Sequence, residues 1–367
     1  MNFDFSGDQK ALGEQLRRAL DKASPLGETR RVMMEREPYS RAAWTVLAEA
    51  GALGAAIPEA YGGVGAGPLE VCIAAYELGF ALASTAYASS FQCSSALLRW
   101  GSDLQKEKWL PALASGAAIG TVAFSENGAG IEASAISTVV REGKLYGAKQ
   151  AVLDAMSADV AVVSALQDGK PLLCVVDLHS VGVTRVPHDC IDPTRPSGDL
   201  VFEDAPCSVL QNTGFSSAQE ILNLGAVVLA FEQIGAAERA LFMARDYALV
   251  RKAFGQQIGA YQGIKHKLAD MYLKIETARV HAYWGAWAIS TNAAELPLAA
   301  AGARVMATEA LDSAAKENVQ VHGGIGFTWE HDCHLFYKRS RAYALALGPA
   351  LRWKEQIMRQ LERANVS

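Results

Sequence analysis

Short β-type segments interrupt an otherwise helical hydrophobic pattern between residues 119 and 210. Apolar runs at 138–140, 160–163, 172–176 and 200–202 are separated by Gly, Pro and Asp residues that favour turns. No stretch between these runs provides a helical crossover of about ten or more residues, so antiparallel pairing is favoured over a parallel sheet. The segment is therefore predicted to form a small antiparallel barrel or sandwich.

The residues on both sides of this segment have helical periodicity. Ser6 and Gln9 have the spacing of a capping box at the start of a first helix. After residue 216 apolar residues recur every three or four positions, and further helices are predicted at 261–289, 297–318 and 349–364. Four long helices with short connections are typical of an up-down bundle.

The predicted fold class is therefore α+β, in three domains. An N-terminal helical domain is expected over 1–117, a middle antiparallel β domain over 118–214, and a C-terminal four-helix bundle over 215–367. A chain of 367 residues is long enough for two or three packed units, because an average domain has roughly 150 residues.

Composition argues against several classes of protein. The 34 basic and 39 acidic residues give no field that attracts a polyanion, so nucleic acid is not an expected partner. The six cysteines are scattered without a CxxC spacing, which is typical of reduced thiols and not of a disulfide framework. The chain has neither the basic start and apolar run of a signal peptide nor an uncharged apolar stretch of 18 residues. A cytoplasmic protein without a membrane partner is expected.

Four motifs stand in order along the chain. They are Pro-Glu-Ala-Tyr-Gly-Gly at 58–63, Ser-Glu-Asn-Gly-Ala-Gly at 125–130, Arg-Lys-Ala-Phe-Gly at 251–255 with the helix that follows, and Gln-Val-His-Gly-Gly-Ile-Gly-Phe at 320–327. The glycines of 57–67 do not indicate a Rossmann fold, because the flanking pattern is helical and not βαβ. With these motifs the chain resembles the acyl-CoA dehydrogenase family over essentially its whole length.

The resemblance implies that this chain contributes residues that bind the ADP half of FAD. In the family these residues reach an FAD that is bound mainly by a neighbouring subunit. An arginine fork suits pyrophosphate oxygens, and glycines let backbone N–H groups approach them. The residues carried over from the family are Arg251, Phe254, Gln262, Gln320, Gly323 and Gly324. A structural alternative stays open, in which Arg251 and Lys252 complement a helix C-terminus that Gly255 closes.

The departures from the family concern the catalytic base. Members that oxidise a thioester remove the α proton with a glutamate, commonly in a Glu-Gly-Thr-like tripeptide after the glycine loop. Leu347 begins the corresponding tripeptide here, and Gly225 occupies the other familiar position of the base. Neither side chain accepts a proton, so no catalytic residue is expected at these positions.

The strand that faces the flavin ring in the family is also changed. Its aromatic and hydroxyl side chains are missing from the matching residues 149–154, Lys-Gln-Ala-Val-Leu-Asp. Ser125 could keep one hydrogen bond near the ring, although a turn partner is the commoner role for such a serine.

Other ionisable residues near the motifs are expected to be structural. Glu232 beside Gln233 is interpreted as a polar contact of the bundle, His322 as a backbone-positioning residue and Glu330 as part of a turn. The run from His331 to His334 brings at most two ligands to one helix face, so no metal site is predicted.

The leading hypothesis is a subunit of a heteromeric FAD-dependent acyl-CoA dehydrogenase. A second, catalytic chain in an α2β2 heterotetramer would supply the glutamate. The resemblance implies an acyl-CoA substrate, with a steroid side-chain thioester as the candidate from the family subset, and an electron-transferring flavoprotein as acceptor. Two alternatives stay open: a self-sufficient homo-oligomeric flavoenzyme with a displaced base, and a flavin-free scaffold subunit.

Overall fold

A computed structural model describes residues 5–126 and 135–366, in two compact units. The bundle unit comprises Met1–Arg31, Cys72–Ala83 and Ala226–Ser367, and the sheet unit comprises Val32–Val71 and Ser84–Gly225. Each unit is assembled from segments that are separated in the sequence. The three-domain division at 117/118 and 214/215 stays a prediction.

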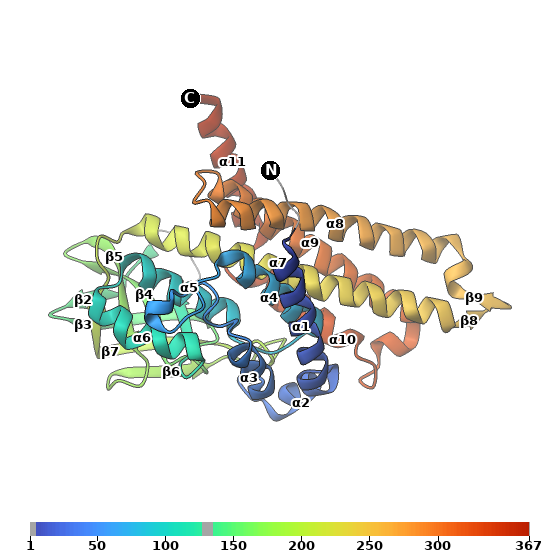
Figure 1. Cartoon of the computed structure of the whole chain (residues 1–367), viewed down its shortest axis with the longest axis horizontal. Helices are drawn as coiled ribbons and strands as arrows, with labels where there is room; N and C mark the ends of the chain where they lie inside the picture. Colours follow the sequence, from blue (N-terminus) through green and yellow to red (C-terminus); the bar gives the residue numbers. More distant parts are fainter. Residues whose placement is uncertain (1–4, 127–134, 367) are drawn as a thin grey trace. The chain divides into compact units, whose positions relative to one another are not determined.

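Helices precede and follow the sheet, as the periodicity predicts (Figure 1). The first group is α1 (Gly7–Ala23), α2 (Leu26–Glu35), α3 (Arg41–Glu49), η1 (Glu59–Tyr61), α4 (Pro68–Ala81), α5 (Tyr87–Trp100) and α6 (Asp103–Ser115). The strands of the sheet are β1 (Gly120–Ala123), β2 (Val139–Arg141), β3 (Lys144–Leu153), β4 (Val160–Gln167), β5 (Lys170–Asp177), β6 (Val183–Pro187) and β7 (Ser197–Val209). The last group is α7 (Phe215–Val250), β8 (Lys252–Ala253), β9 (Gln256–Gln257), η3 (Ile258–Ala260), α8 (Gln262–Ser290), α9 (Leu296–His322), η4 (Gly323–Phe327), α10 (Cys333–Leu345) and α11 (Ala350–Val366).

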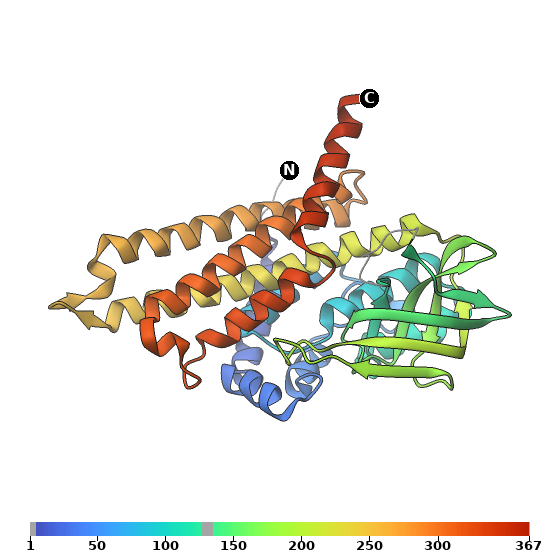
Figure 2. The same cartoon turned by 180° about the vertical axis from the view of Figure 1, so that it is seen from behind.

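The strands of the sheet unit pair into a closed ring, which corresponds to the barrel of the two expected alternatives, a barrel or a sandwich. Figure 2 shows the strands of this unit from behind. β4, β2, β3, β7 and β5 pair in that order, β5 pairs with β4 again, and β1 and β6 attach at the side. Most pairs are antiparallel, but β4 pairs in parallel with both β1 and β2. The prediction considered only helical crossovers, whereas here the β2–β3 hairpin lies within the connection between β1 and β4.

The bundle unit holds the predicted long helices, whose observed bounds lie close to the expected ones. α8 and α9 run side by side, with the β8–β9 hairpin at one end of α8 (Figure 1). The sequence analysis missed α10, because its buried stripe includes Arg339 and Ser340 among apolar residues. Arg339 is satisfied by the carbonyl oxygens of Ala83 and Leu82, at 3.2 and 3.4 Å.

α4 and α7 approach each other closely in the bundle unit. A Cβ atom at Gly79 would lie 1.9 Å from the backbone oxygen of Glu232, and one at Gly235 would lie 2.1 Å from the backbone oxygen of Tyr76. Real side chains do not approach a backbone atom so closely, so only glycine fits at both positions.

α7 is long and apolar enough, by length and composition, to cross a membrane, but 94% of its most apolar window is buried. Burial on all sides is the property of a core helix. A single helix of this kind is weak evidence for a membrane span.

Candidate functional site

The chain leaves α7 in a tight hairpin that carries two of the predicted site residues. The Arg251 N–H donates to the Tyr247 carbonyl oxygen at 2.9 Å and so completes the last turn of α7. Phe254 and Gly255, with φ of 50° and 86°, form the two-residue turn between β8 and β9. Positive φ at both central residues is typical of the turns that join antiparallel strands. Gly255 therefore closes a hairpin and does not close the helix.

Phe254 lowers the stability of the isolated chain in one way and adds nothing to it in another. A non-glycine residue in the left-handed region costs about 1–2 kcal/mol. The side chain is also 98% exposed, so its apolar surface gains nothing from burial. Such strain persists where the surrounding structure compensates for it, and it is often found at functional sites.

The second predicted segment is the turn that ends α9. Gly323 has φ of 64°, which favours glycine, and a Cβ atom at Gly323 or Gly324 would meet nothing within 4 Å. The packing of this chain therefore does not require glycine at Gly324. The open space above the turn lets an external group approach the backbone.

A ring contact brings the hairpin and the glycine turn to the same end of the bundle unit. Tyr247 stacks on His322 with 4.3 Å between ring centroids. His322 is buried and its Nδ1 lies 2.8 Å from the carbonyl oxygen of Asn318, which supports the backbone-positioning role. Gln320 near the end of α9 and Gln262 at the start of α8 are both exposed.

These residues suit the nucleotide half of a dinucleotide. Arg251 is exposed and, within the described part of the chain, has no ion-pair partner. Its planar guanidinium is free to bind two oxygens of a pyrophosphate, while exposed Phe254 offers an aromatic face. The donors and the open glycine turn therefore fit the ADP half of FAD.

The first expected position of the base is filled by an apolar side chain. Leu347 lies between α10 and α11, half-buried and with φ of 58°. Arg304, which is fully buried, donates to the carbonyl oxygen of Ala346 at 2.6 Å and also to that of Tyr343. The turn is thus held in place by the protein interior, and no carboxylate stands at Leu347.

The second expected position has no room for a side chain. In the sheet unit, a Cβ atom at Gly225 would lie 2.2 Å from Gln92 Nε2, which donates to the Ile221 carbonyl oxygen at 3.1 Å. In the bundle unit, Glu232 is 2% exposed and accepts a hydrogen bond from the Tyr343 hydroxyl. This burial supports the interpretation of Glu232 as a structural contact.

The strand predicted to match the ring-facing strand directs its charged residue inward. Lys149 is buried and paired with Glu126, and its Nζ lies 2.9 Å from Ser164 Oγ. Burial acts to raise the pKa of Glu126, but hydrogen bonds from Lys149 and Ser137 hold that pKa below its usual value. Burial also lowers the pKa of Lys149. Residues 127–130 of the motif that contains Glu126 lie outside the described residues.

Neither residue at the aromatic and hydroxyl positions offers those groups. Ala151 is exposed, has φ of 51° and donates its N–H to Asp199 Oδ1 at 3.0 Å. Leu153 is half-buried, and its carbonyl oxygen accepts from the Thr121 hydroxyl at 2.7 Å. Ser125 contributes its carbonyl oxygen to the N–H of Gln150 at 2.9 Å. Exposed residues of this chain fit the ADP half of FAD, but Ala151 and Leu153 lack the aromatic and hydroxyl groups that face the flavin ring in the family.

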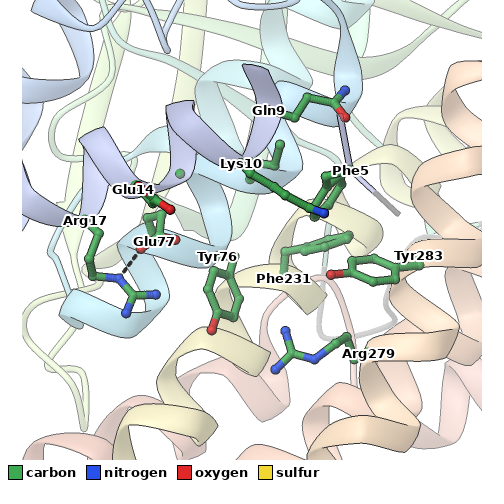
Figure 3. A pocket seen from close by; sticks show the side chains of 12 residues that line it. Phe5, Gln9, Lys10, Glu14, Arg17, Tyr76, Glu77, Phe231, Arg279 and Tyr283 are labelled. Carbon is green, nitrogen blue, oxygen red and sulfur yellow. Dashed lines mark hydrogen bonds and ion pairs between the residues drawn. The ribbon is translucent and has the colours of Figure 1, made fainter. Parts of the chain in front are cut away.

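A cavity of about 410 Å³, which no sequence pattern indicated, lies among α1, α4, α7 and α8 (Figure 3). Arg17 is paired with Glu77 at this cavity, and Arg279 is paired with Glu238 at 3.1 Å. Burial raises the pKa of Glu77 even beside Arg17. Because these two arginines pair with glutamates within the chain, each is less available to an anionic group than Arg251 is.

Comparison with known proteins agrees with this arrangement of helices and sheet. The model of the acyl-CoA dehydrogenase N-terminal domain matches residues 6–117, and that of the acyl-CoA dehydrogenase C-terminal domain matches residues 212–362. The chain is similar to acyl-CoA dehydrogenase IpdE2 of Mycolicibacterium smegmatis, with 32% identity over 97% of this chain and 98% of the relative.

Two solved structures of heteromeric complexes have the same fold. The ChsE4-ChsE5 complex from Mycobacterium tuberculosis contains a chain with a TM-score of 0.90 and 26% identity, covering 99% of both chains. The Tcur3481-Tcur3483 steroid ACAD contains a chain with a TM-score of 0.89 and 26% identity, covering 98% of this chain and 99% of the other. The matches of both family models and of a full-length relative place the chain in the acyl-CoA dehydrogenase family, whose members are FAD-dependent.

Proposed function

We propose that this chain is the subunit of a heteromeric acyl-CoA dehydrogenase that completes the FAD site of a second, catalytic chain. In this proposal Arg251, Phe254 and Gln262 from the hairpin side, with Gln320 and the Gly323–Gly324 turn, hold the ADP half of the cofactor. The partner supplies the glutamate and the surroundings of the flavin ring. The proposed assembly is an α2β2 heterotetramer in the cytoplasm.

The exposed tip of the hairpin is the observation that carries the proposal. Phe254 is 98% exposed in a strained conformation, beside an arginine without an ion-pair partner among the described residues. Leu249 and Val250, at 57% and 73% exposure, add apolar surface at the same end of α7. A chain that functioned without a partner would leave this surface in water, whereas a second subunit and its cofactor would cover it.

The filled base positions support the division of labour. Bound FAD supplies a hydride acceptor for the β hydrogen of an acyl-CoA, and the same oxidation needs a carboxylate to remove the α proton. Leu347 and Gly225 have no proton-accepting group, so the proposal assigns this step to the partner chain. The role of this chain is to bind and orient the nucleotide part of the cofactor.

The comparisons favour the same assembly and substrate class. Two structural relatives are heteromeric complexes, and one of them is described as a steroid acyl-CoA dehydrogenase. By analogy, the proposed substrate is the CoA thioester of a steroid side chain. The family resemblance adds an electron-transferring flavoprotein as the acceptor of electrons from the reduced flavin.

Co-expression with the partner tests the proposal. The partner is identified by pull-down from the native source, and we expect a chain of similar length with a Glu-Gly-Thr-like tripeptide. This chain alone should purify with little flavin, whereas the pair should be yellow with about one FAD per unlike pair, since a completed site stabilises the complex. The flavin spectrum and the amounts of both chains are measured on the same sample.

Two results would overturn the proposal. Stoichiometric flavin and acyl-CoA desaturation by this chain alone would indicate a self-sufficient flavoenzyme with a displaced base. A colourless complex with the co-purifying chain would indicate a scaffold subunit that has lost the cofactor.

A further inference from the structure

Three metal-ligating side chains meet where α9 ends and α10 begins. His322, His331 and Cys333 each place one donor atom within 4.8 Å of the others. We propose that they form a binding site for one zinc ion, with water as the fourth ligand. The run from His331 to His334 offers at most two ligands on one helix face, and the fold brings in the third ligand, His322, from the preceding helix.

His322 has one ring nitrogen left for coordination. Its Nδ1 lies 2.8 Å from the Asn318 carbonyl oxygen, which can only accept a hydrogen bond. The ring proton therefore sits on Nδ1, and Nε2 keeps its lone pair. Histidines that bind metal ions are commonly held in this way by a backbone carbonyl. His322 is 5% exposed and is stacked on Tyr247, so the ring has little freedom to turn away.

The other two donors stand at the start of α10. Cys333 is fully buried, and the His331 ring centroid lies 4.3 Å from that of His322. The N–H of Cys333 points to His331 Nδ1 at 3.4 Å, a long hydrogen bond that a metal ion can replace. One thiolate and two imidazoles are the ligands that zinc prefers, whereas magnesium and calcium prefer oxygen.

The distances allow the site to close. Zinc–nitrogen bonds of about 2.0–2.1 Å and zinc–sulfur bonds of about 2.3 Å place tetrahedral donors about 3.3–3.6 Å apart. The present donors lie within 4.8 Å, so each pair has to approach by about 1.5 Å at most. His331 is only half-buried, and rotation of its side chain supplies such a movement.

Coordination is a proton exchange without oxidation or reduction. The Cys333 thiol gives its proton to solvent as the zinc–sulfur bond forms.

The site would connect the two ends of the glycine turn. His322 directly precedes Gly323, and His331 and Cys333 follow the turn by a few residues. A bound zinc ion would therefore restrict residues 323–332, which include Gly324. Any effect of this restriction on FAD binding rests on the proposed function. Zinc binding itself needs neither FAD nor a partner chain.

Zinc titration of the full-length chain tests the inference. The chain is stripped with a chelator, titrated with zinc sulfate against a chromophoric competitor, and analysed for metal content. We expect about one zinc ion per chain, and affinity at least about tenfold lower in Cys333→Ser and in His331→Gln. The matched controls are His334→Gln, the next histidine in the sequence, and Cys190→Ser, a thiol of the sheet unit, and both should bind as the parent does.

Cobalt substitution and hydrogen exchange give two independent readouts. Cobalt in the parent protein should produce a thiolate-to-metal absorption band that Cys333→Ser lacks. Zinc should slow amide exchange within 323–332 in the parent, while circular dichroism verifies that each variant is folded.

Three outcomes would overturn the inference: no zinc bound by the parent, equal binding by Cys333→Ser, or an equal loss in His334→Gln. The second would indicate adventitious binding to histidines. None of these experiments measures flavin. A negative result for zinc binding can therefore be told apart from a negative result for the proposed function.

Discussion

The hairpin at the end of α7 and the turn around Leu347 differ in what they offer to a ligand. Arg251 and Phe254 are exposed, and the glycine turn beside them leaves open space above its backbone. Leu347, by contrast, is half-buried in a turn that Arg304 holds from within. Exposed residues that suit a nucleotide can thus persist in a chain whose expected proton-transfer position is held by buried side chains.

The hairpin also differs from Gly225, the second expected position of the base, in its cost to the isolated chain. Phe254 combines a left-handed backbone with an unburied ring, which is unfavourable without a partner. Gly225 adjoins the buried side-chain amide of Gln92, and this amide already donates a hydrogen bond to the Ile221 carbonyl oxygen. The hairpin at Phe254 is therefore stabilised when a partner covers it. The packed surroundings of Gly225, by contrast, do not accommodate a larger side chain.

The largest effect is expected for Gly225→Glu. Its Cβ atom would start 2.2 Å from Gln92 Nε2, and its carboxylate would have to enter buried, packed surroundings. Overpacking and the buried charge should together lower the free energy of unfolding by about 3 kcal/mol or more. Denaturant unfolding measures this loss, and the added change Gln92→Ala should recover part of it. A single variant as stable as the parent would show that the position is open after all.

A smaller effect is expected for Arg251→Ala in the co-purified complex. Loss of a charge-assisted hydrogen bond to pyrophosphate costs about 1.5–3 kcal/mol, so flavin retention should fall at least about tenfold. Flavin is measured by absorbance after dialysis. Arg245→Ala is the control, because Arg245 is an arginine of α7 that already pairs with Asp246 at 2.7 Å. Equal retention in both variants would remove Arg251 from the site.

Phe254→Asn should separate stability from binding. Asparagine tolerates the left-handed region, so the free chain should gain about 1 kcal/mol of stability. Retention of flavin and partner should fall at the same time, because the aromatic surface is lost. Phe327→Asn is the matched control, since Phe327 is 85% exposed without a positive φ and should bring no such gain. Unchanged binding by Phe254→Asn would argue that the exposed ring has no partner.

The smallest effect is expected for Leu347→Glu. A glutamate at this turn restores only the proton acceptor, because Ala151 and Leu153 still lack the aromatic and hydroxyl groups expected beside the ring. Flavin content of the complex should be unchanged, and the variant chain alone should not desaturate an acyl-CoA. Robust dehydrogenation by this variant would contradict the proposed division of labour.

The sequence was most informative where one period dominates a long segment. The apolar run at 160–163 predicted a strand, and β4 forms there and is buried throughout Val160–Ala165. The capping box of Ser6 and Gln9 starts α1 as expected. Local patterns of this kind depend on neighbours a few residues away, which a single sequence contains.

Contacts between distant segments could not be read in the same way. α10 was missed because Arg339 replaces an apolar residue in its buried stripe and is satisfied by carbonyl groups near residue 82. The parallel pairs of β4 were missed because a hairpin takes the place of a helical crossover. The sequence also could not show that the side chain of Gln92 fills the space beside Gly225. Such facts depend on which segments meet in space.

The glycine crossing of α4 and α7 has a consequence for dissecting the protein. Because Gly79 and Gly235 bring two backbones into direct contact, residues near the N-terminus form one wall of the same interior as the C-terminal helices. A fragment cut at residue 215 would leave that wall behind and uncover α7. Truncation experiments should therefore remove whole spatial layers, and not stretches of consecutive sequence.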